Sequence, residues 1–283
     1  MQLRNPGAEI FIPDGQPVDE GLARTTHMAI SAHQDDVEIM AYHGVAQCFG
    51  IPEKWFCGAV TTNGAGSPRA GIYADYTDEE MRQVRKVEQK KAGYVGEFSA
   101  VVLMDYSSAD IKNPPGEAIV AELEDLLLAT TPEVVYTHNL ADKHDTHVAT
   151  AVRLIQACRE LPADARPKKL LGGEVWRDLD WMTDEDKVPL DCEGHENLQA
   201  ALLGVYDSQI AGGKRYDLAT MGRRKAHATY FASHGLDETT SLNFAMDLTP
   251  LIEDPSLCIA DYAQQLISRF ASEVQGRLAK SLG

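Results

Sequence analysis

Short apolar runs alternate with longer stretches in which apolar residues recur at helical spacing. The runs predict strands at 26–32, 55–61, 100–104 and 133–137. The stretches between and after them predict helices at 36–49, 77–95, 119–127 and 148–155. This β-α-β-α order predicts an α/β fold, namely a Rossmann-like, mostly parallel sheet with helices on both faces. A functional site is then expected at the C-terminal ends of the strands.

The two ends of the chain show weaker patterns. Residues 1–25 are rich in proline, glycine and charge and have no period, so they predict an N-terminal extension. Residues 26–283 contain no internal repeat and no linker, which predicts a single domain. Within it we expect a strand at 170–176, an acidic loop at 181–194, and helices at 196–209 and 218–233.

Composition narrows the class of protein. A chain of 283 residues with 44% hydrophobic content can bury a large core. No apolar run approaches the roughly 20 residues that span a bilayer, and the N-terminus lacks a signal-peptide core, so we expect a cytoplasmic protein. The five cysteines form no C-x-x-C pair, which indicates reduced thiols. A net charge of −17 disfavours nucleic acid as a partner. We also expect a homo-oligomer.

Two polar clusters carry the candidate chemistry. The first, Ala32-His33-Gln34-Asp35-Asp36, follows the strand predicted at 26–32. The second, His138 to His147, follows the strand predicted at 133–137. If the two strands are parallel neighbours, both clusters lie at one edge of the sheet.

Each cluster also has a simpler explanation. Asp35 and Asp36 could serve only as helix caps, because aspartate is favoured at that position. The histidines could belong to a hydrated loop. However, a histidine and a carboxylate three residues apart, with a further ligand from a separate turn, match a zinc site that keeps one position open. His144 and His147 are three residues apart at a helix start, so they project from nearly one side.

At these residues the chain resembles a known family. Ala32-His33-Gln34-Asp35-Asp36 resembles the A-H-P-D-D motif of the PIG-L/LmbE-like zinc deacetylases, and His144-Asp145-Thr146-His147 resembles their H-P-D-H motif. Three further segments are similar to family segments in order and spacing: Thr62–Gly66, Arg85–Glu88 and Tyr206–Gln209. These enzymes remove acetyl groups from N-acetylglucosaminyl compounds.

The resemblance implies a role for each position. It makes His33, Asp36 and His147 the zinc ligands and Asp35 the general base. His144 becomes the residue that stabilises the oxyanion or protonates the leaving amine. As substrate-binding residues, the prediction includes Arg69 and Asp105.

Two departures from the family motifs stand out. Gln34 replaces the usual proline, which we expect to loosen the turn. Asp145-Thr146 replaces Pro-Asp, which removes the acid beside the zinc histidine. Asp142 or Asp145 could then supply the carboxylate that supports this histidine.

The resulting function is a zinc-dependent hydrolase that removes acetyl from an acetamido-sugar substrate. Three alternatives remain. Some proteins of the same superfamily are hydratases that act on unsaturated carboxylic acids. A two-histidine, one-carboxylate iron oxygenase would also fit the ligand types, but those sites usually lie on an all-β barrel. A binding protein without catalysis would be expected to lack the general base, whereas Asp35 is present.

Overall fold

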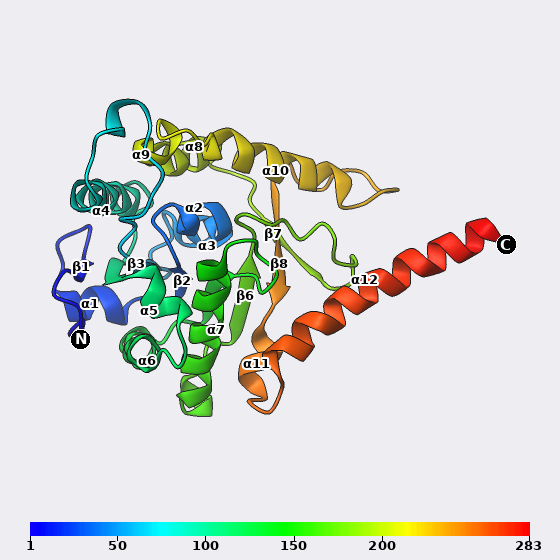
Figure 1. Ribbon diagram of the computed structural model, residues 1–283, viewed down its shortest axis with the longest axis horizontal. Helices are drawn as coiled ribbons and strands as arrows, with labels where there is room; N and C mark the ends of the chain where they lie inside the picture. The colour runs from blue at the N-terminus through cyan, green and yellow to red at the C-terminus, as the bar shows by residue number, and fades with distance from the viewer.

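The computed structural model describes residues 1–283 and holds one eight-stranded sheet of order β1-β4-β3-β2-β5-β6-β8-β7 (Figure 1). The strands are β1 (Glu9–Phe11), β2 (His27–Ser31), β3 (Phe56–Thr62), β4 (Ala100–Tyr106), β5 (Val134–His138), β6 (Lys169–Gly173), β7 (Lys187–Asp191) and β8 (Leu242–Asp247). The strands from β4 to β6 are all parallel, whereas β1, β7 and β8 pair antiparallel with their neighbours. The parallel part has the chain order of a Rossmann-type sheet. The predicted fold class is confirmed.

Helices cover both faces of this sheet (Figure 1). They are α1 (Val18–Ala23), α2 (Asp36–Met40), α3 (Tyr42–Cys48), α4 (Asp78–Val95), α5 (Ser108–Lys112), α6 (Glu117–Thr130), α7 (Asp145–Glu160), α8 (Glu196–Gly204), α9 (Asp207–Ile210), α10 (Tyr216–Tyr230), α11 (Thr249–Glu253) and α12 (Ile259–Leu282). Two short 3₁₀ turns lie at Gly71–Tyr73 and Ala163–Ala165. Thr77 and Glu80 form a capping box at the start of α4.

The core consists of two buried clusters, one on each face of the sheet. Met28 and Ile30 of β2 belong to the cluster that includes α6 and α7, whereas Ala29 belongs to the cluster that includes α2, α3 and α8. Successive side chains of a strand point to opposite faces, so the central strand is buried on both. This double burial explains why the sequence shows the parallel strands as continuous apolar runs.

The structure differs from the predicted elements in three places. The helix predicted at 36–49 is interrupted at Ala41, where the backbone leaves the helical region, and the one predicted at 196–209 divides into α8 and α9. The predicted acidic loop contains β7. This strand is at the edge of the sheet, where Pro189 and charged ends are tolerated, so it lacks the apolar run of a central strand.

Residues 1–25 contribute to the main sheet. β1 pairs with β4 at its edge, and α1 packs against α6. Lys86 donates to the carbonyl of Gly7, and Arg82 forms a two-point ion pair with the neighbouring Asp105. The division of the chain into an N-terminal extension and a single domain stays a prediction. Residues 9–11 of this extension pair with β4 at one edge of the sheet.

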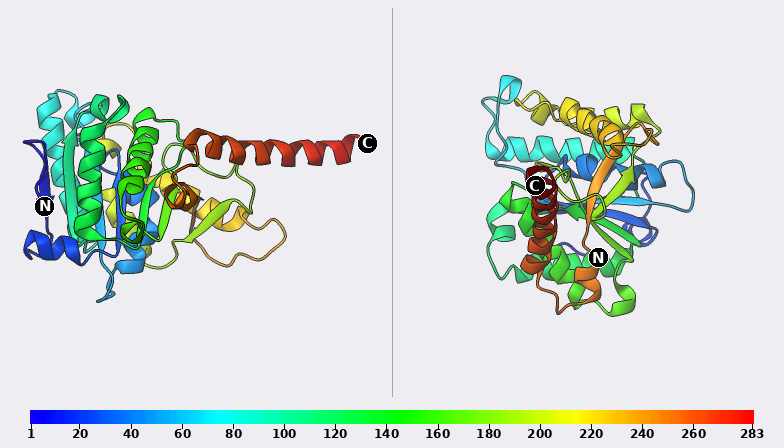
Figure 2. Two further views of the ribbon diagram at one scale, coloured as in Figure 1. Left: turned by 90° about the horizontal axis from the view of Figure 1, so that it is seen from below. Right: turned by 90° about the vertical axis from the view of Figure 1, so that its right-hand side faces the viewer.

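The last helix, α12, projects from the rest of the molecule (Figure 2). Of its 24 residues only Leu266 is buried. An apolar stripe at four-residue spacing, Phe270, Val274, Leu278 and Leu282, is exposed. No helix in the structure has the length and apolarity that crossing a membrane requires.

Candidate metal centre

The two polar clusters meet between β2 and β5, where the order of the strands in the sheet changes direction. β2 pairs with β3 on one side and with β5 on the other. The turns that leave the carboxyl ends of β2 and β5 therefore lie side by side, at the position where Rossmann-type sheets open a crevice. The expected convergence of the two clusters is observed.

The first turn, His33 to Asp36, is held closed by its own hydrogen bonds. The backbone N–H of His33 donates to Asp36 Oδ2 at 2.7 Å, and the N–H of Asp36 donates to the carbonyl of His33 at 3.3 Å. Asp35 adopts a φ of 98°, a conformation that is strained for a residue with a side chain. The turn directs both the imidazole of His33 and the carboxylate of Asp36 towards β5.

Three side-chain atoms converge on one point. His33 Nδ1 lies 3.2 Å from Asp36 Oδ2 and 3.1 Å from His147 Nε2, and the latter two atoms are 3.4 Å apart. Donors about 2.0–2.1 Å from a tetrahedral zinc ion lie about 3.3–3.4 Å from one another. Two imidazole nitrogens and one carboxylate oxygen also form a donor set typical of such a site. The residues therefore fit a bound metal ion.

Charge at this point also favours a cation. Removal from water lowers the pKa of His33 to about 4, so its ring is neutral, as a metal ligand must be. Burial would raise the pKa of Asp36, but the surrounding His147, His33 and His138 hold it well below its usual value. For His147 burial acts in the other direction and would lower the pKa, but the nearby carboxylates of Asp36 and Asp142 outweigh burial, so the pKa is raised. An ionised carboxylate thus faces two imidazoles in a largely buried place beside the cavity.

Two further residues of the second cluster support the donors. The ring of His138 stacks on that of His147 at 3.9 Å, and its Nε2 accepts the N–H of Ala32 at 2.8 Å. His138 lies 3.6 Å from Asp36 Oδ2, but the Nε2 lone pair is already used by this bond, so His138 fixes the first turn. Asp142 Oδ1 lies 3.5 Å from His147 Nδ1. Of the two carboxylates proposed as a support for His147, the structure places Asp142 there.

Asp35 occupies the other side of the first turn. Its carboxylate lines a cavity of about 250 Å³ together with His33, Asp36 and His144, which we call the main cavity. Burial raises its pKa well above the usual range, and Asp36 adds to this, whereas Arg85, 3.4 Å away, opposes it. A carboxylate with a raised pKa beside the donor atoms suits a group that takes up a proton.

His144 caps α7 at the mouth of the main cavity. Its Nδ1 accepts the backbone N–H of Thr146 at 3.3 Å, and its ring lies 4.6 Å from that of His147. Burial lowers its pKa. Neutral His144 therefore carries its proton on Nε2 and can donate it in a hydrogen bond. His33, His144 and His147 also form a possible donor set, so His144 is an alternative third ligand.

Arg85 and Gln34 join the first turn to the loop after β3. Arg85 donates to the carbonyl of Gln34 and to the hydroxyl of Ser67. The amide of Gln34 is buried and donates to the carbonyl of Thr62 at 3.1 Å. Gln34 therefore fastens the turn, and the expectation that it loosens the turn is wrong. Gly64 leaves room for the side chain of Gln34, because a Cβ atom at position 64 would lie 2.3 Å from Gln34 Oε1.

The predicted residues divide into those that reach the main cavity and those that do not. The loop Asn63 to Pro68 lines it, as expected. Arg69 instead donates to the carbonyl of Ala65 and pairs with Asp78, and Asp105 pairs with Arg82. Neither Arg69 nor Asp105 lines the main cavity.

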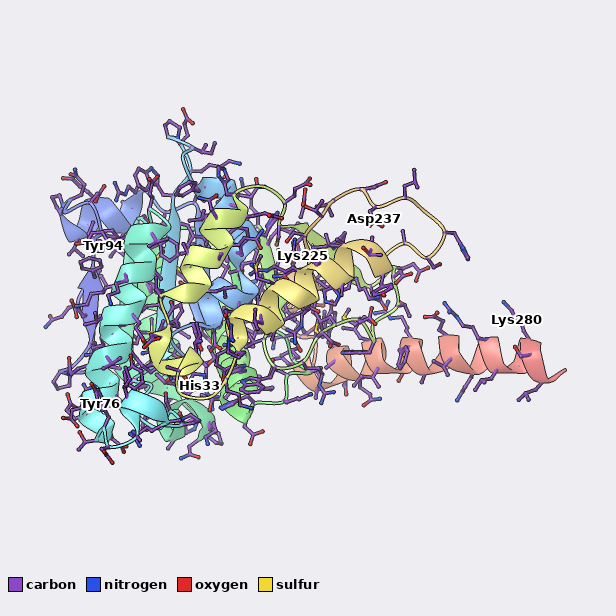
Figure 3. The ribbon with its side chains drawn as sticks, turned by 90° about the horizontal axis from the view of Figure 1, so that it is seen from above. His33, Tyr76, Tyr94, Lys225, Asp237 and Lys280 are labelled. Carbon is purple, nitrogen blue, oxygen red and sulfur yellow. The ribbon has the colours of Figure 1, made fainter.

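Some of the other lining residues were missed by sequence reasoning. Val175, Lys214 and Tyr216 line the main cavity together with Trp176 and with Gln209, which belongs to the segment Tyr206–Gln209 noted in the sequence. Lys214 and Tyr216 lie in a polar stretch with no motif, so no sequence signal distinguishes them from surface residues. Figure 3 shows His33 among the helices of the body, far from Lys280 at the end of α12.

Comparison with known proteins agrees with this geometry. Residues 28–158 match the model of the PIG-L family, described as GlcNAc-PI de-N-acetylase. The matched segment runs from β2 into α7 and includes every proposed donor residue described above. The resemblance inferred from the sequence is confirmed. The comparison with curated proteins found no match.

Several solved structures share the fold. N,N'-diacetylchitobiose deacetylase from Pyrococcus horikoshii has a TM-score of 0.62 at 12% identity, over 84% of this chain and 88% of its own. GalB, the 4-carboxy-2-hydroxymuconate hydratase from Pseudomonas putida, has a TM-score of 0.61 at 15% identity, over 79% and 96%. The A40926 pseudoaglycone deacetylase Dbv21 has a TM-score of 0.57 at 16% identity, over 79% and 97%. At these identities the likeness concerns the fold.

Proposed function

We propose that the chain is a zinc-dependent hydrolase that removes the acetyl group from an N-acetylglucosamine-type substrate. The observation that carries this proposal is the convergence of His33 Nδ1, Asp36 Oδ2 and His147 Nε2 within 3.4 Å of one another. The description of the matched family and the names of two structural neighbours, both deacetylases, support the reaction class.

His33, Asp36 and His147 would hold the metal ion. Bound zinc would supply a Lewis acid that polarises the amide carbonyl and makes water acidic near neutral pH. Asp35 accepts the proton of the attacking water, since its carboxylate lines the main cavity and is not one of the three proposed metal donors. His144 donates a hydrogen bond from Nε2 to the oxygen on which negative charge develops. The proton held by Asp35 then passes to the leaving amine nitrogen, so the products are acetate and a free amine.

The test is to incubate zinc-loaded protein with a panel of N-acetylglucosaminides and to follow new primary amine and acetate. We expect both products in equal amounts. A hydratase is the second candidate, because GalB shares the fold with a TM-score of 0.61. A parallel panel of unsaturated dicarboxylic acids, followed by loss of ultraviolet absorbance, distinguishes the two. Turnover of the second panel alone would overturn the deacetylase proposal.

We also propose that the protein is cytoplasmic and self-associates through α12. The cysteines are all free, and four of the five are buried, as expected for a reducing compartment. The apolar stripe of α12 is symmetric about Val274: an antiparallel pair of helices would place Phe270 of each copy beside Leu278 of the other. Light scattering should show a dimer that Phe270→Glu dissociates, while Ser272→Glu, on the side of the helix opposite Phe270 and Val274, leaves it intact. A monomeric wild-type chain would contradict this.

A further inference from the structure

A second cavity, of about 180 Å³, adjoins the main cavity. We call it the side cavity. The two share Ile39, Val175, Trp176, Lys214 and Tyr216, so they adjoin across a common wall. The rings of Trp176 and Tyr216 meet edge to face at 5.8 Å in the shared wall. All the shared residues except Ile39 lie beyond the segment that matches the family model, so the match gives no information about what binds here.

The side cavity is basic in a strongly acidic protein. Lys214, Arg215 and Arg223 line it, and no carboxylate does, although the chain carries a net charge of −17. Arg215 is neutralised by Asp217 at 2.7 Å. Lys214 and Arg223 form no ion pair in the structure. Two cations without counter-ions in one recess favour an anionic ligand.

The two cations are held in different ways. Arg223 Nη1 donates to the carbonyl of Val175 at 2.7 Å, which leaves its other N–H groups free. The ammonium of Lys214 lies 5.3 Å from the ring of Trp176. The backbone N–H of Trp176 donates to Asp142 Oδ2 at 3.0 Å, and the other oxygen of Asp142 faces His147. The basic wall is therefore anchored to the residue that supports the metal donors.

We propose that the side cavity binds an anionic group, a phosphate or a carboxylate, on the part of the substrate remote from the amide. This anion site narrows the proposed substrate to an acetamido sugar that bears a negative charge. Lys214 and Arg223 contact the anion, while Trp176 and Tyr216 cover the apolar face of the sugar ring. This inference rests on the proposed deacetylase function for the position of the amide.

The test compares neutral N-acetylglucosamine with its 6-phosphate and with N-acetylmuramic acid, which carries a carboxylate. The wild-type protein should favour at least one anionic compound by about tenfold or more in kcat/KM, as expected for charge-assisted hydrogen bonds. The Lys214→Gln, Arg223→Gln double variant should bring this ratio close to one. Arg223→Lys, which keeps the charge, should retain most of the preference. Lys225→Gln is the matched control, because Lys225 lies on the same helix and pairs with Glu196 outside the cavity.

Binding is measured separately, so that failure of the two proposals can be distinguished. Calorimetric titration of zinc-loaded Asp35→Asn protein with the three compounds needs no turnover. Tighter binding of an anionic compound that the double variant abolishes supports the side cavity even if no amide is cleaved. Equal affinity for the neutral and both anionic compounds, or a preference that survives in the double variant, would overturn it.

Discussion

The two ends of strand β2 each carry a histidine whose pKa falls to about 4, and in both cases burial is the main cause. His33, just after the carboxyl end, faces Asp36 and His147. His27, at the amino end, bonds through Nδ1 to the hydroxyl of Thr26 at 3.0 Å and belongs to no set of possible metal donors. The same lowering of the pKa thus accompanies a proposed metal ligand, His33, and a core residue, His27. The convergence of other donors, and not the pKa, distinguishes the functional end of the strand.

The largest expected effect separates these two histidines directly. His33→Ala and His147→Ala should lower the zinc content from about one per chain to roughly a tenth or less, because two donors cannot hold the ion against dialysis. His27→Ala should keep its zinc. Metal analysis of the dialysed proteins is the measurement. Full zinc retention in His147→Ala would make His144 or His138 the third ligand.

The second-largest expected effect is on kcat, and it distinguishes the proposed catalytic groups from the proposed metal ligands. Asp35→Asn should retain zinc and lose about 10²–10⁴-fold in kcat, since an amide cannot accept the proton of the water. His144→Gln should show a similar but smaller loss. Steady-state rates and zinc content are measured on the same samples. Loss of zinc from either variant would show that the assignment of donors and catalytic groups is wrong.

A smaller effect concerns the carboxylate behind His147. Asp142→Asn should weaken zinc affinity by about 10- to 100-fold, because the amide orients the imidazole less well and no longer increases its basicity. Asp145→Asn is the matched control, since Asp145 is exposed at the start of α7. Competition with a chelator of known affinity gives the two constants. Equal zinc affinities of the two variants would show that Asp142 does not support zinc binding.

The smallest effect belongs to the amino end of the strand. The pKa of His27 is lowered on folding, so the unfolded chain binds more protons between about pH 6.5 and pH 4. The free energy of unfolding should therefore fall as the pH falls through this window, by up to about 1 kcal/mol per pH unit after allowance for solvent screening. His27→Gln should flatten the curve. Urea unfolding of both proteins in excess zinc, at pH 7.5 and pH 5, measures the difference. Equal slopes would contradict the assignment.

The sequence predicted those parts of the molecule that burial makes distinctive. β2, β3, β4 and β5 are covered on both faces, so they appear as apolar runs, and the clusters after β2 and β5 follow from the positions of those runs. By contrast, β1 has three residues and β7 contains Pro189, and both lie at edges of the sheet. Edge strands need not be apolar, so their sequences resemble loops.

The candidate site was predictable where chemistry is concentrated in one short segment. His33, Asp35 and Asp36 lie within four residues, and the turn brings them together whatever the rest of the chain does. Lys214 and Tyr216 reach the same cavity only because α8, α9 and α10 pack across the sheet. The orientation of Arg69 depends on its contact with Asp78, which no local pattern contains.

The proposed zinc donors come from turns more than a hundred residues apart in the chain, and this separation has a thermodynamic consequence. The unfolded chain cannot bring His33 and His147 together without closing a long loop, so it binds the ion far more weakly than the native protein does. Zinc bound by these residues would therefore act as a reversible cross-link between the ends of β2 and β5. Free zinc at a hundred times its dissociation constant adds about 2.7 kcal/mol to the stability of the native state. The melting temperature of this protein should accordingly report the free zinc concentration around it.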